Sequence, residues 1–228
     1  MFAFIFNIYL EELIFMYDII ILFLLFIIYS FLGWIIETVA CSIYYKIVAD
    51  RGFLIGPICP IYGVSALFMI IVLKRYNKDV IVLFAMAFLL CSILEYITSY
   101  IMERLFKTRW WDYSNRVLNV NGRVCLRNSF CFGILGVLLL YYINPFALDI
   151  LYKIPALYLN ISALILFIIF VTDYIVSFFI ISKFTKKVTL IKKDSSNEIN
   201  SKIRQELLKF KFHRRLIRAF PKFNIKKE

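Results

Sequence analysis

Three acidic residues stand inside the apolar runs of this sequence or directly at their ends, where a carboxylate is costly to keep. Glu37, Glu95 and Asp173 each lie fifteen or more residues after the start of such a run. A charge at that depth in a bilayer is unfavourable unless it is paired or reaches water. Such carboxylates can bind a ligand or carry a proton, or they can pair with a cation for structural reasons only. Glu37 falls near the edge of its run, where a simple boundary charge is an equally good interpretation.

Arginines in the loops supply the expected counter-charges. Arg51 stands in one loop, and Arg123 and Arg127 stand four residues apart at the start of a later apolar run. Arginine suits carboxylates and anionic ligands because its guanidinium donates in a planar fork. Basic residues that only anchor the inner face of the membrane are the alternative. We expect the three carboxylates to meet these arginines in one cluster, with Glu95 deepest.

The segment that must position this cluster reads RGFLIGPICPIYG, from Arg51 to Gly63. Its prolines and glycines disfavour a regular helix. A helix from Ile61 to Leu73 has thirteen residues, or about 20 Å of rise, against a hydrocarbon core of about 30 Å. To cross, the chain must also use Phe53–Pro60, which places irregular backbone at membrane depth. The alternative is a helix that starts at Pro57 or Pro60 after an interfacial loop.

Four residues of this segment join the candidate site: Gly56, Pro57, Pro60 and Tyr62. We expect the Gly56-Pro57 backbone to form one wall of the cluster. Free amides there could receive an anionic small molecule.

The rest of the chain is dominated by apolar runs typical of membrane helices. Hydrophobic residues make up 62% of the sequence, and its mean hydropathy is +0.81. Besides the broken segment, the runs are Ile19–Ile36, Val80–Leu94, Phe130–Ile143 and Ala156–Ile181. About twenty apolar residues span a bilayer. We therefore predict an all-α polytopic membrane protein with about five transmembrane helices, one of them broken by Gly-Pro.

Two boundaries of these spans are less well defined by the sequence. Asn144-Pro145 is expected to end the fourth span, because proline interrupts a helix. A sixth span remains open if Phe2–Leu10 enters the membrane, although nine apolar residues are too few to cross it.

The net charge of +12 is concentrated at the end of the chain. Residues 183–228 hold fifteen Lys or Arg and four acidic residues, whereas residues 1–182 hold twelve and eleven. We predict a transmembrane domain at 1–182 and a basic cytoplasmic tail at 183–228. A basic amphipathic helix from Glu198 to Ala219 would lie on anionic membrane lipid. Nucleic-acid binding is not expected, since no recognition module accompanies the charge.

Basic residues also orient the predicted spans. With five crossings, the loops on the side of the tail hold eight Lys or Arg, and the opposite loops hold four. The positive-inside rule then places the N-terminus outside and the C-terminus in the cytoplasm. We expect a multi-pass protein of the plasma membrane.

No cofactor or metal is expected. The single histidine is His213, in the tail, and the five cysteines form no CxxC pair. The sequence has no GxxxxGK[ST] phosphate-binding loop. Any ATP hydrolysis would therefore need a separate ATPase subunit.

The order of the motifs resembles one family of bacterial membrane proteins. FLGWIIE is followed by RGFLIGPICPIYG, a span that bears a glutamate, WWDYS and NGRVCLRNS, between about Tyr17 and Asp173. This combination resembles the putative ABC-transporter type IV family, also called CmpB. One departure is Asp50, where the family usually has asparagine before RGF.

The resemblance implies functional positions and adds Asp112 to the candidate site. The implied positions are Gly33, Trp34, Glu37, Arg51, Gly52, Phe53, Gly56, Pro57, Pro60, Tyr62, Gly63, Glu95, Trp111, Asp112, Tyr113, Ser114, Gly122 and Arg123. The family name does not by itself establish a mechanism.

Three hypotheses about function follow. The leading one is a transporter-like, permease-type subunit with a polar cavity that opens toward the cytoplasm. A membrane enzyme acting on lipid-linked substrates would use Glu37, Glu95 or Asp173 as acid or base, but no serine or cysteine nucleophile motif supports it. The third is a non-catalytic scaffold or regulator whose tail binds lipid or a partner.

Overall fold

The computed structural model describes residues 2–46, 52–193 and 224–225, and these are almost entirely helical. The helices are α1 (Phe2–Tyr45), α2 (Pro60–Leu73), η1 (Lys74–Tyr76), α3 (Val80–Phe106), α4 (Leu126–Leu138), η2 (Leu139–Ile143), α5 (Asn144–Lys153) and α6 (Ala156–Lys193). The two-residue strands are β1 (Thr108–Arg109), β2 (Asn119–Val120), β3 (Val124–Cys125) and β4 (Asn224–Ile225). Arg51 and the predicted tail helix Glu198–Ala219 lie outside the described residues. The predicted all-α membrane fold is confirmed.

Four helical segments in the described part of the chain are long and apolar enough to cross a membrane. They are Asp18–Ile43, Val80–Phe106, Leu126–Lys153 and Ala156–Lys186. The remaining predicted span contains α2, whose 14 residues rise only about 21 Å. The predicted count of five therefore depends on the non-helical residues 52–59 that precede α2.

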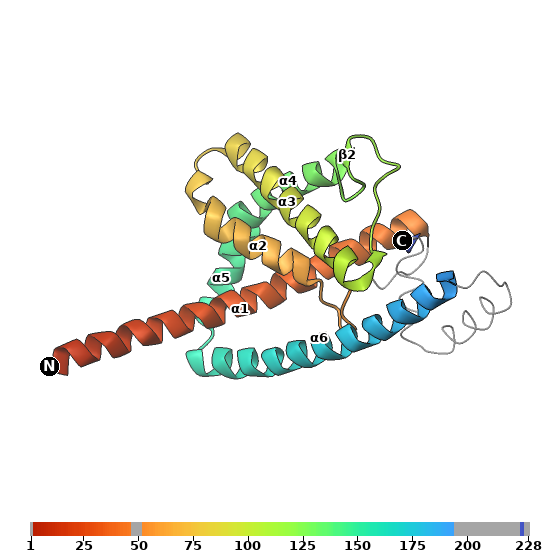
Figure 1. Cartoon of the computed structure of the whole chain (residues 1–228). Coiled ribbons are helices and arrows are strands. Elements are labelled where there is room, and N and C mark those ends of the chain that lie inside the picture. The colour runs from red at the N-terminus through yellow and green to blue at the C-terminus, as the bar shows by residue number, and fades with distance from the viewer. Residues whose placement is uncertain (1, 47–51, 194–223, 226–228) are drawn as a thin grey trace.

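Contacts between α1 and α2 show that these helices are antiparallel. Tyr62 lies against Gly33, and Gly63, one residue later, lies against Ser30 and Phe26. Residue numbers thus rise along α2 as they fall along α1. A short turn then returns the chain into α3, which runs beside α2 (Figure 1).

The next helices continue this alternation. Ser92 of α3 bonds to Ser129 of α4, and Phe84 lies against Gly133, so α3 and α4 are antiparallel. We name the end of the bundle at residues 74–79 the turn end. The end that carries residues 107–125, between α3 and α4, is the loop end.

Helix α6 runs in the same direction as α1. The rings of Phe23 and Phe167 are 5.8 Å apart, and those of Phe26 and Phe170 are 5.3 Å apart, so both numbers rise together. Figure 1 shows both helices running toward the loop end. Helices α1, α3 and α6 therefore point one way, and α2 and α4 point the other.

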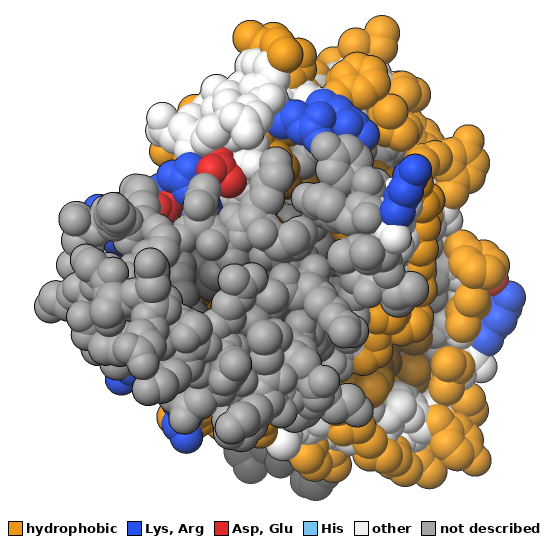
Figure 2. Space-filling view, turned by 90° about the vertical axis from the view of Figure 1, so that its right-hand side faces the viewer, with side chains coloured by type: hydrophobic (Ala, Val, Ile, Leu, Met, Phe, Trp, Pro, Cys, Tyr) orange, Lys and Arg blue, Asp and Glu red, His pale blue; other side chains and the backbone are white. Residues whose placement is uncertain are grey.

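The apolar core occupies the half of the bundle nearer the turn end. Its most buried members include Leu25, Leu73, Leu83 and Leu159. Many other large apolar side chains of the long helices are exposed. Figure 2, which views the loop end, shows such side chains along one flank and several Lys and Arg near the top of the face. An exposed apolar flank is what lipid contact requires.

The fourth span does not end at Pro145, contrary to the sequence prediction. It continues through the π-helical turn Leu139–Ile143 into α5, and Pro145 stands in the first turn of α5. A proline in a first turn lacks only an amide that has no intrahelical partner, and the wider π turn absorbs the mismatch. The buried Tyr29 hydroxyl donates to Asn144 Oδ1 at 2.9 Å and secures the junction to α1.

The loop end is closed by short strand pairs. Strands β2 and β3 form an antiparallel hairpin, with Asn121 and Gly122 in left-handed backbone conformations at its turn. Strand β1 pairs with β4, so residues 224–225 of the tail contact the loop that follows α3.

Candidate functional site

The non-helical segment is held by a carboxylate from α6. Asp173 Oδ1 accepts the amide of Ile55 at 2.9 Å, and Oδ2 accepts the amide of Gly56 at 2.8 Å. The Ser177 hydroxyl donates to Asp173 Oδ1 at 2.9 Å and accepts the Ile55 amide at 3.0 Å. The amides that were expected to receive an anionic small molecule are therefore occupied by Asp173. Pro57, the other expected wall residue, is exposed.

The same segment is anchored to the middle of α1. The amide of Cys59 donates to the carbonyl oxygen of Ser30 at 3.0 Å, and Ser30 lies near the midpoint of Asp18–Ile43. Pro60 then begins α2. The backbone of residues 55–59 is thus bonded to the middle of one long apolar helix and to Asp173, near the middle of another.

Small residues allow α1 and α2 to approach closely. A Cβ added to Gly33 would overlap the Tyr62 side chain, and one added to Gly63 would overlap the Ser30 hydroxyl. This approach brings the Tyr62 hydroxyl to Glu37 Oε2 at 2.9 Å. The half-buried Glu37 also accepts a weak bond from Cys41 Sγ at 3.6 Å.

Glu95 lies on the buried face of α3, beside this pair. Its Oε1 accepts the Tyr113 hydroxyl at 3.2 Å, while its Oε2 is buried and has no hydrogen-bond partner among the described residues. The residue is only 6% exposed. Glu37 is close enough for its charge to act on Glu95.

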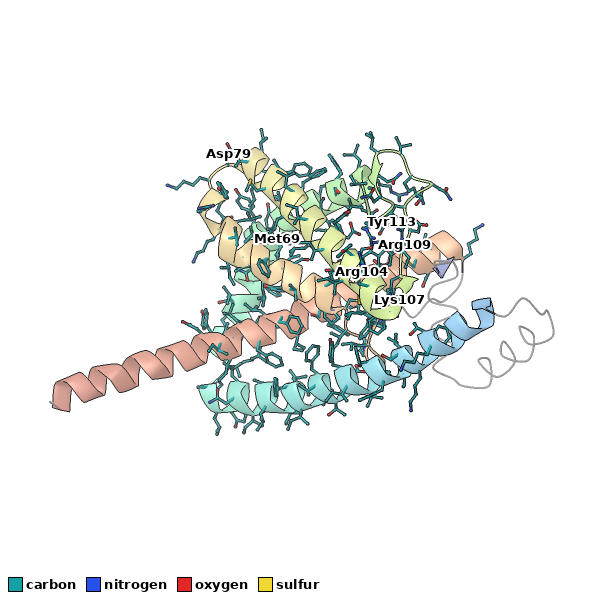
Figure 3. All side chains as sticks on the ribbon, in the orientation of Figure 1. Met69, Asp79, Arg104, Lys107, Arg109 and Tyr113 are labelled. Carbon is teal, nitrogen blue, oxygen red and sulfur yellow. The ribbon has the colours of Figure 1, made fainter. Side chains whose placement is uncertain are left out.

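Tyr113 comes from the loop and donates to Glu95, while the Glu37 carboxylate lies close enough for its charge to act on the phenol. Burial raises its pKa well above the usual value, and the charges of Glu95 and Glu37 act in the same direction. The phenol therefore stays protonated and remains a donor. Figure 3 shows Tyr113 and Arg109 at the loop end, while Asp79 lies at the turn end.

Arg123 pairs with a different glutamate from the one expected. Its Nη1 lies 2.6 Å from Glu103 Oε2 and 3.4 Å from the Ser99 hydroxyl. Its guanidinium also stacks over the rings of Tyr96 and Tyr100, at 5.6 and 5.4 Å from their centroids. Glu103 lies two helical turns beyond Glu95, so it meets the loop from which Arg123 comes.

Asp112 organises the loop. Its Oδ1 accepts the backbone amide of Ser114 at 3.0 Å, the Ser114 hydroxyl at 2.5 Å and Arg109 Nη1 at 3.4 Å. Burial raises the pKa of Asp112, but the bonds from Ser114 and the charge of Arg109 outweigh it, so the pKa lies below its usual value. A Cβ on Gly122 would meet Asp112 Oδ1 at 2.5 Å, which explains a glycine there.

The structure therefore divides the candidate residues into three groups and leaves Arg127 apart from them. Glu37, Tyr62 and Glu95 come together with Tyr113; Gly56 and Asp173 form a second contact beside them; Asp112 and Arg123 belong to the loop. Arg127, in the first turn of α4, is exposed and separate from the buried Arg123. Arg51 lies outside the described residues. We name Glu37, Tyr62, Glu95 and Tyr113 the polar layer.

Sequence reasoning missed Tyr113 as the partner of Glu95 and Glu103 as the partner of Arg123. Both partners are about twenty residues away along the chain and meet only because the loop folds back. Helical spacing did place Glu95 and Glu103 on one face of α3. It carries no information about which loop residue reaches each of them.

The long apolar helices define a multi-pass α-helical membrane protein, and Glu95 of the polar layer is buried within it. A family model described as "Putative ABC-transporter type IV" matches residues 24–178, more than half of the sequence. The chain belongs to this family, as its motifs predicted. No curated protein and no solved structure matches the chain.

Proposed function

We propose that the chain is the membrane-spanning, permease-type subunit of a transporter whose solute passes through the polar layer. The observation that carries this proposal is the placement of residues 55–59, non-helical backbone bonded to the midpoint of α1 and to Asp173 of α6. In lipid, irregular backbone is stable only where it is packed in protein or lines a polar passage. Discontinuous helices of this kind form the substrate sites of many transporters.

The direction of the helices supports the same proposal. Because α1 and α3 point the same way, the chain must return across the membrane between them, and among the described residues, 52–73 form the segment that can do so. Helix α2 covers the half nearer the turn end, so residues 52–59 cover the half nearer the loop end. The polar layer lies beside that irregular half.

The loop end is the cytoplasmic end in this proposal. The loops at this end hold twice as many Lys and Arg as the opposite loops, as the positive-inside rule requires for a plasma-membrane protein. The N-terminus is then outside, the tail is cytoplasmic, and the polar layer opens as a cavity toward the cytoplasm. The basic tail would contact membrane lipid.

Energy for transport would come from a separate ATPase subunit, since this sequence has no phosphate-binding loop. Its docking site would be the β2–β3 hairpin and the two residues before it, where Val117, Leu118 and Val120 are 83%, 70% and 55% exposed. Exposed apolar side chains next to basic ones suit a protein partner.

A two-stage experiment tests the proposal. Purified protein would first be screened for solutes that raise its melting temperature, because a ligand that binds the folded state stabilises it. Each stabilising solute would then be followed across proteoliposomes that contain wild type or Glu95→Gln, with the ATPase subunit added where one is found. Uptake by wild type that is lost in Glu95→Gln would support the proposal.

Two other results would contradict the proposal, and each would favour a different function. Chemical conversion of the stabilising solute would indicate the membrane enzyme. Binding without uptake, in the presence and absence of the ATPase, would indicate a scaffold or regulator.

A further inference from the structure

One carboxylate oxygen of the polar layer is buried but accepts no hydrogen bond from the described residues. Glu95 Oε2 is buried and accepts no hydrogen bond within the part of the chain that the structure describes. Two other carboxylates have compensating partners: Asp173 accepts two backbone amides, and Glu103 forms an ion pair with Arg123 at 2.6 Å. A buried acceptor without a donor is destabilising, and a buried charge without a counter-charge is more so.

The surroundings of Glu95 are electrically negative. Tyr113 donates a neutral hydroxyl, and Glu37 adds a second carboxylate whose charge acts on Glu95. The nearest arginine of the hairpin, Arg123, directs its guanidinium to Glu103 and Ser99 instead. An anion would be repelled here, whereas a cation would gain from both carboxylates.

The hydrogen-bonding needs of Glu95 Oε2 limit the kinds of cation that could bind there. A proton on Oε2 would remove the charge but would leave an O–H group that itself needs an acceptor. A multivalent metal ion needs several ligands, and no group of three or more His, Cys, Asp or Glu is placed to hold one among the described residues. A protonated amine supplies both the charge and an N–H donor, and tyrosine rings beside it add cation–π attraction.

We propose that Glu95 is the acceptor for the protonated amine group of a small organic cation, which reaches it from the loop end past Tyr113. This inference rests on the proposed transport function, because it names the class of solute for the same polar layer. Glu37 supplies the second negative charge, and Tyr113 and Tyr62 supply the aromatic walls.

The test uses the purified full-length chain with defined probes. The amines ethylammonium chloride and butane-1,4-diamine dihydrochloride would be titrated against sodium chloride and sodium acetate at equal ionic strength, with choline chloride as a cation that has no N–H donor. The melting temperature and the apparent Kd would be measured for wild type, Glu95→Gln, Glu95→Asp and Asp149→Asn. Asp149 is a matched control, because its carboxylate pairs with Lys153 at the surface of α5.

The proposal predicts saturable stabilisation of wild type by at least one amine and by neither sodium salt. Glu95→Gln should weaken that binding at least tenfold, Glu95→Asp should weaken it less, and Asp149→Asn should leave it unchanged. Equal binding to wild type and Glu95→Gln, stabilisation by acetate alone, or no saturable effect of any amine would overturn it. If Glu95→Gln fails to fold, Glu95→Asp is compared with Asp149→Asn. Weaker amine binding in Glu95→Asp alone would support the proposal, and equal binding in both would overturn it.

Failure of this inference can be told apart from failure of the proposed function. An anionic solute that stabilises the protein and is taken up would contradict the amine site and leave the transporter proposal standing. An amine that binds at Glu95 but is not taken up would support the site and contradict the transporter.

Discussion

The amide of Gly56 donates to Asp173 Oδ2 over 2.8 Å, although 117 residues separate the two along the chain. A Cβ at residue 56 would lie 2.8 Å from the same oxygen, so only glycine admits the carboxylate without displacement. Together with the bond from Ile55, this contact fixes non-helical backbone against α6. An acidic side chain from the last described long helix thus stabilises the break in the second predicted span.

Asp173→Asn should destabilise the protein. The asparagine side chain is neutral and has one accepting oxygen, so it cannot replace the carboxylate that accepts both backbone amides. Hydrogen bonds to charged groups contribute about 1.5–3 kcal/mol each, so we expect a loss of about 2 kcal/mol in the free energy of unfolding. Thermal unfolding in detergent would measure it. The surface variant Asp149→Asn should change stability by less than about 0.5 kcal/mol. A similar small effect of both variants would show that the Asp173 contact contributes little.

Gly33→Ala should force α1 and α2 apart, since the added Cβ overlaps the Tyr62 side chain. Overpacking of this kind costs about 1–3 kcal/mol. The loss should be much smaller when Gly33→Ala is made in a Tyr62→Ala background, because the clash is then absent. Equal losses in both backgrounds would mean that residue 33 does not limit the helix approach.

Arg123→Gln should be among the most destabilising single changes in the loop, because it leaves Glu103 buried without its closest cation. Breaking a buried ion pair costs about 3–5 kcal/mol. Glu103→Gln combined with Arg123→Gln should recover part of that loss, as measured by thermal unfolding. Exchange of the charges between Glu95 and Arg123 should not restore stability. Rescue by that second exchange would show that Arg123 serves Glu95.

The stabilising effect of Asp112 should depend on pH. The pKa of Asp112 in the folded protein lies below the usual value of 3.8 for an aspartate, so its stabilisation is complete above that value and is lost as the pH falls through the folded pKa. The difference in melting temperature between wild type and Asp112→Asn should be constant from pH 7 to about 5 and should shrink below about pH 4. A difference that grows as the pH falls would reverse the sign of the effect.

The sequence was most informative about the long helices and about spacing within one helix. Runs of apolar residues locate α3 and α6, and a spacing of three or four residues is enough to put Ser92, Glu95, Ser99 and Glu103 on one face of α3. It failed at Pro145, because a proline in a sequence does not reveal that a π turn will accommodate it.

The contacts of the polar layer could not be read from the sequence for a different reason. Tyr113 and Arg123 reach their glutamates because Asp112, Ser114 and Gly122 fold the loop back onto α3. Loop geometry of this kind is set by hydrogen bonds between distant residues, and no periodic pattern in the sequence predicts it.

The central claim is that residues 52–73 cross the membrane with an irregular half and a helical half. In a cysteine-free background, single cysteines at Lys46 and Asn77 would be labelled with an impermeant maleimide in intact cells and in inverted vesicles. If residues 52–73 cross the membrane, residue 77 should be labelled only in intact cells and residue 46 only in inverted vesicles. Labelling of both residues from the same side would contradict it, because α1 and α3 would then be joined without a crossing and residues 55–59 would not lie at membrane depth.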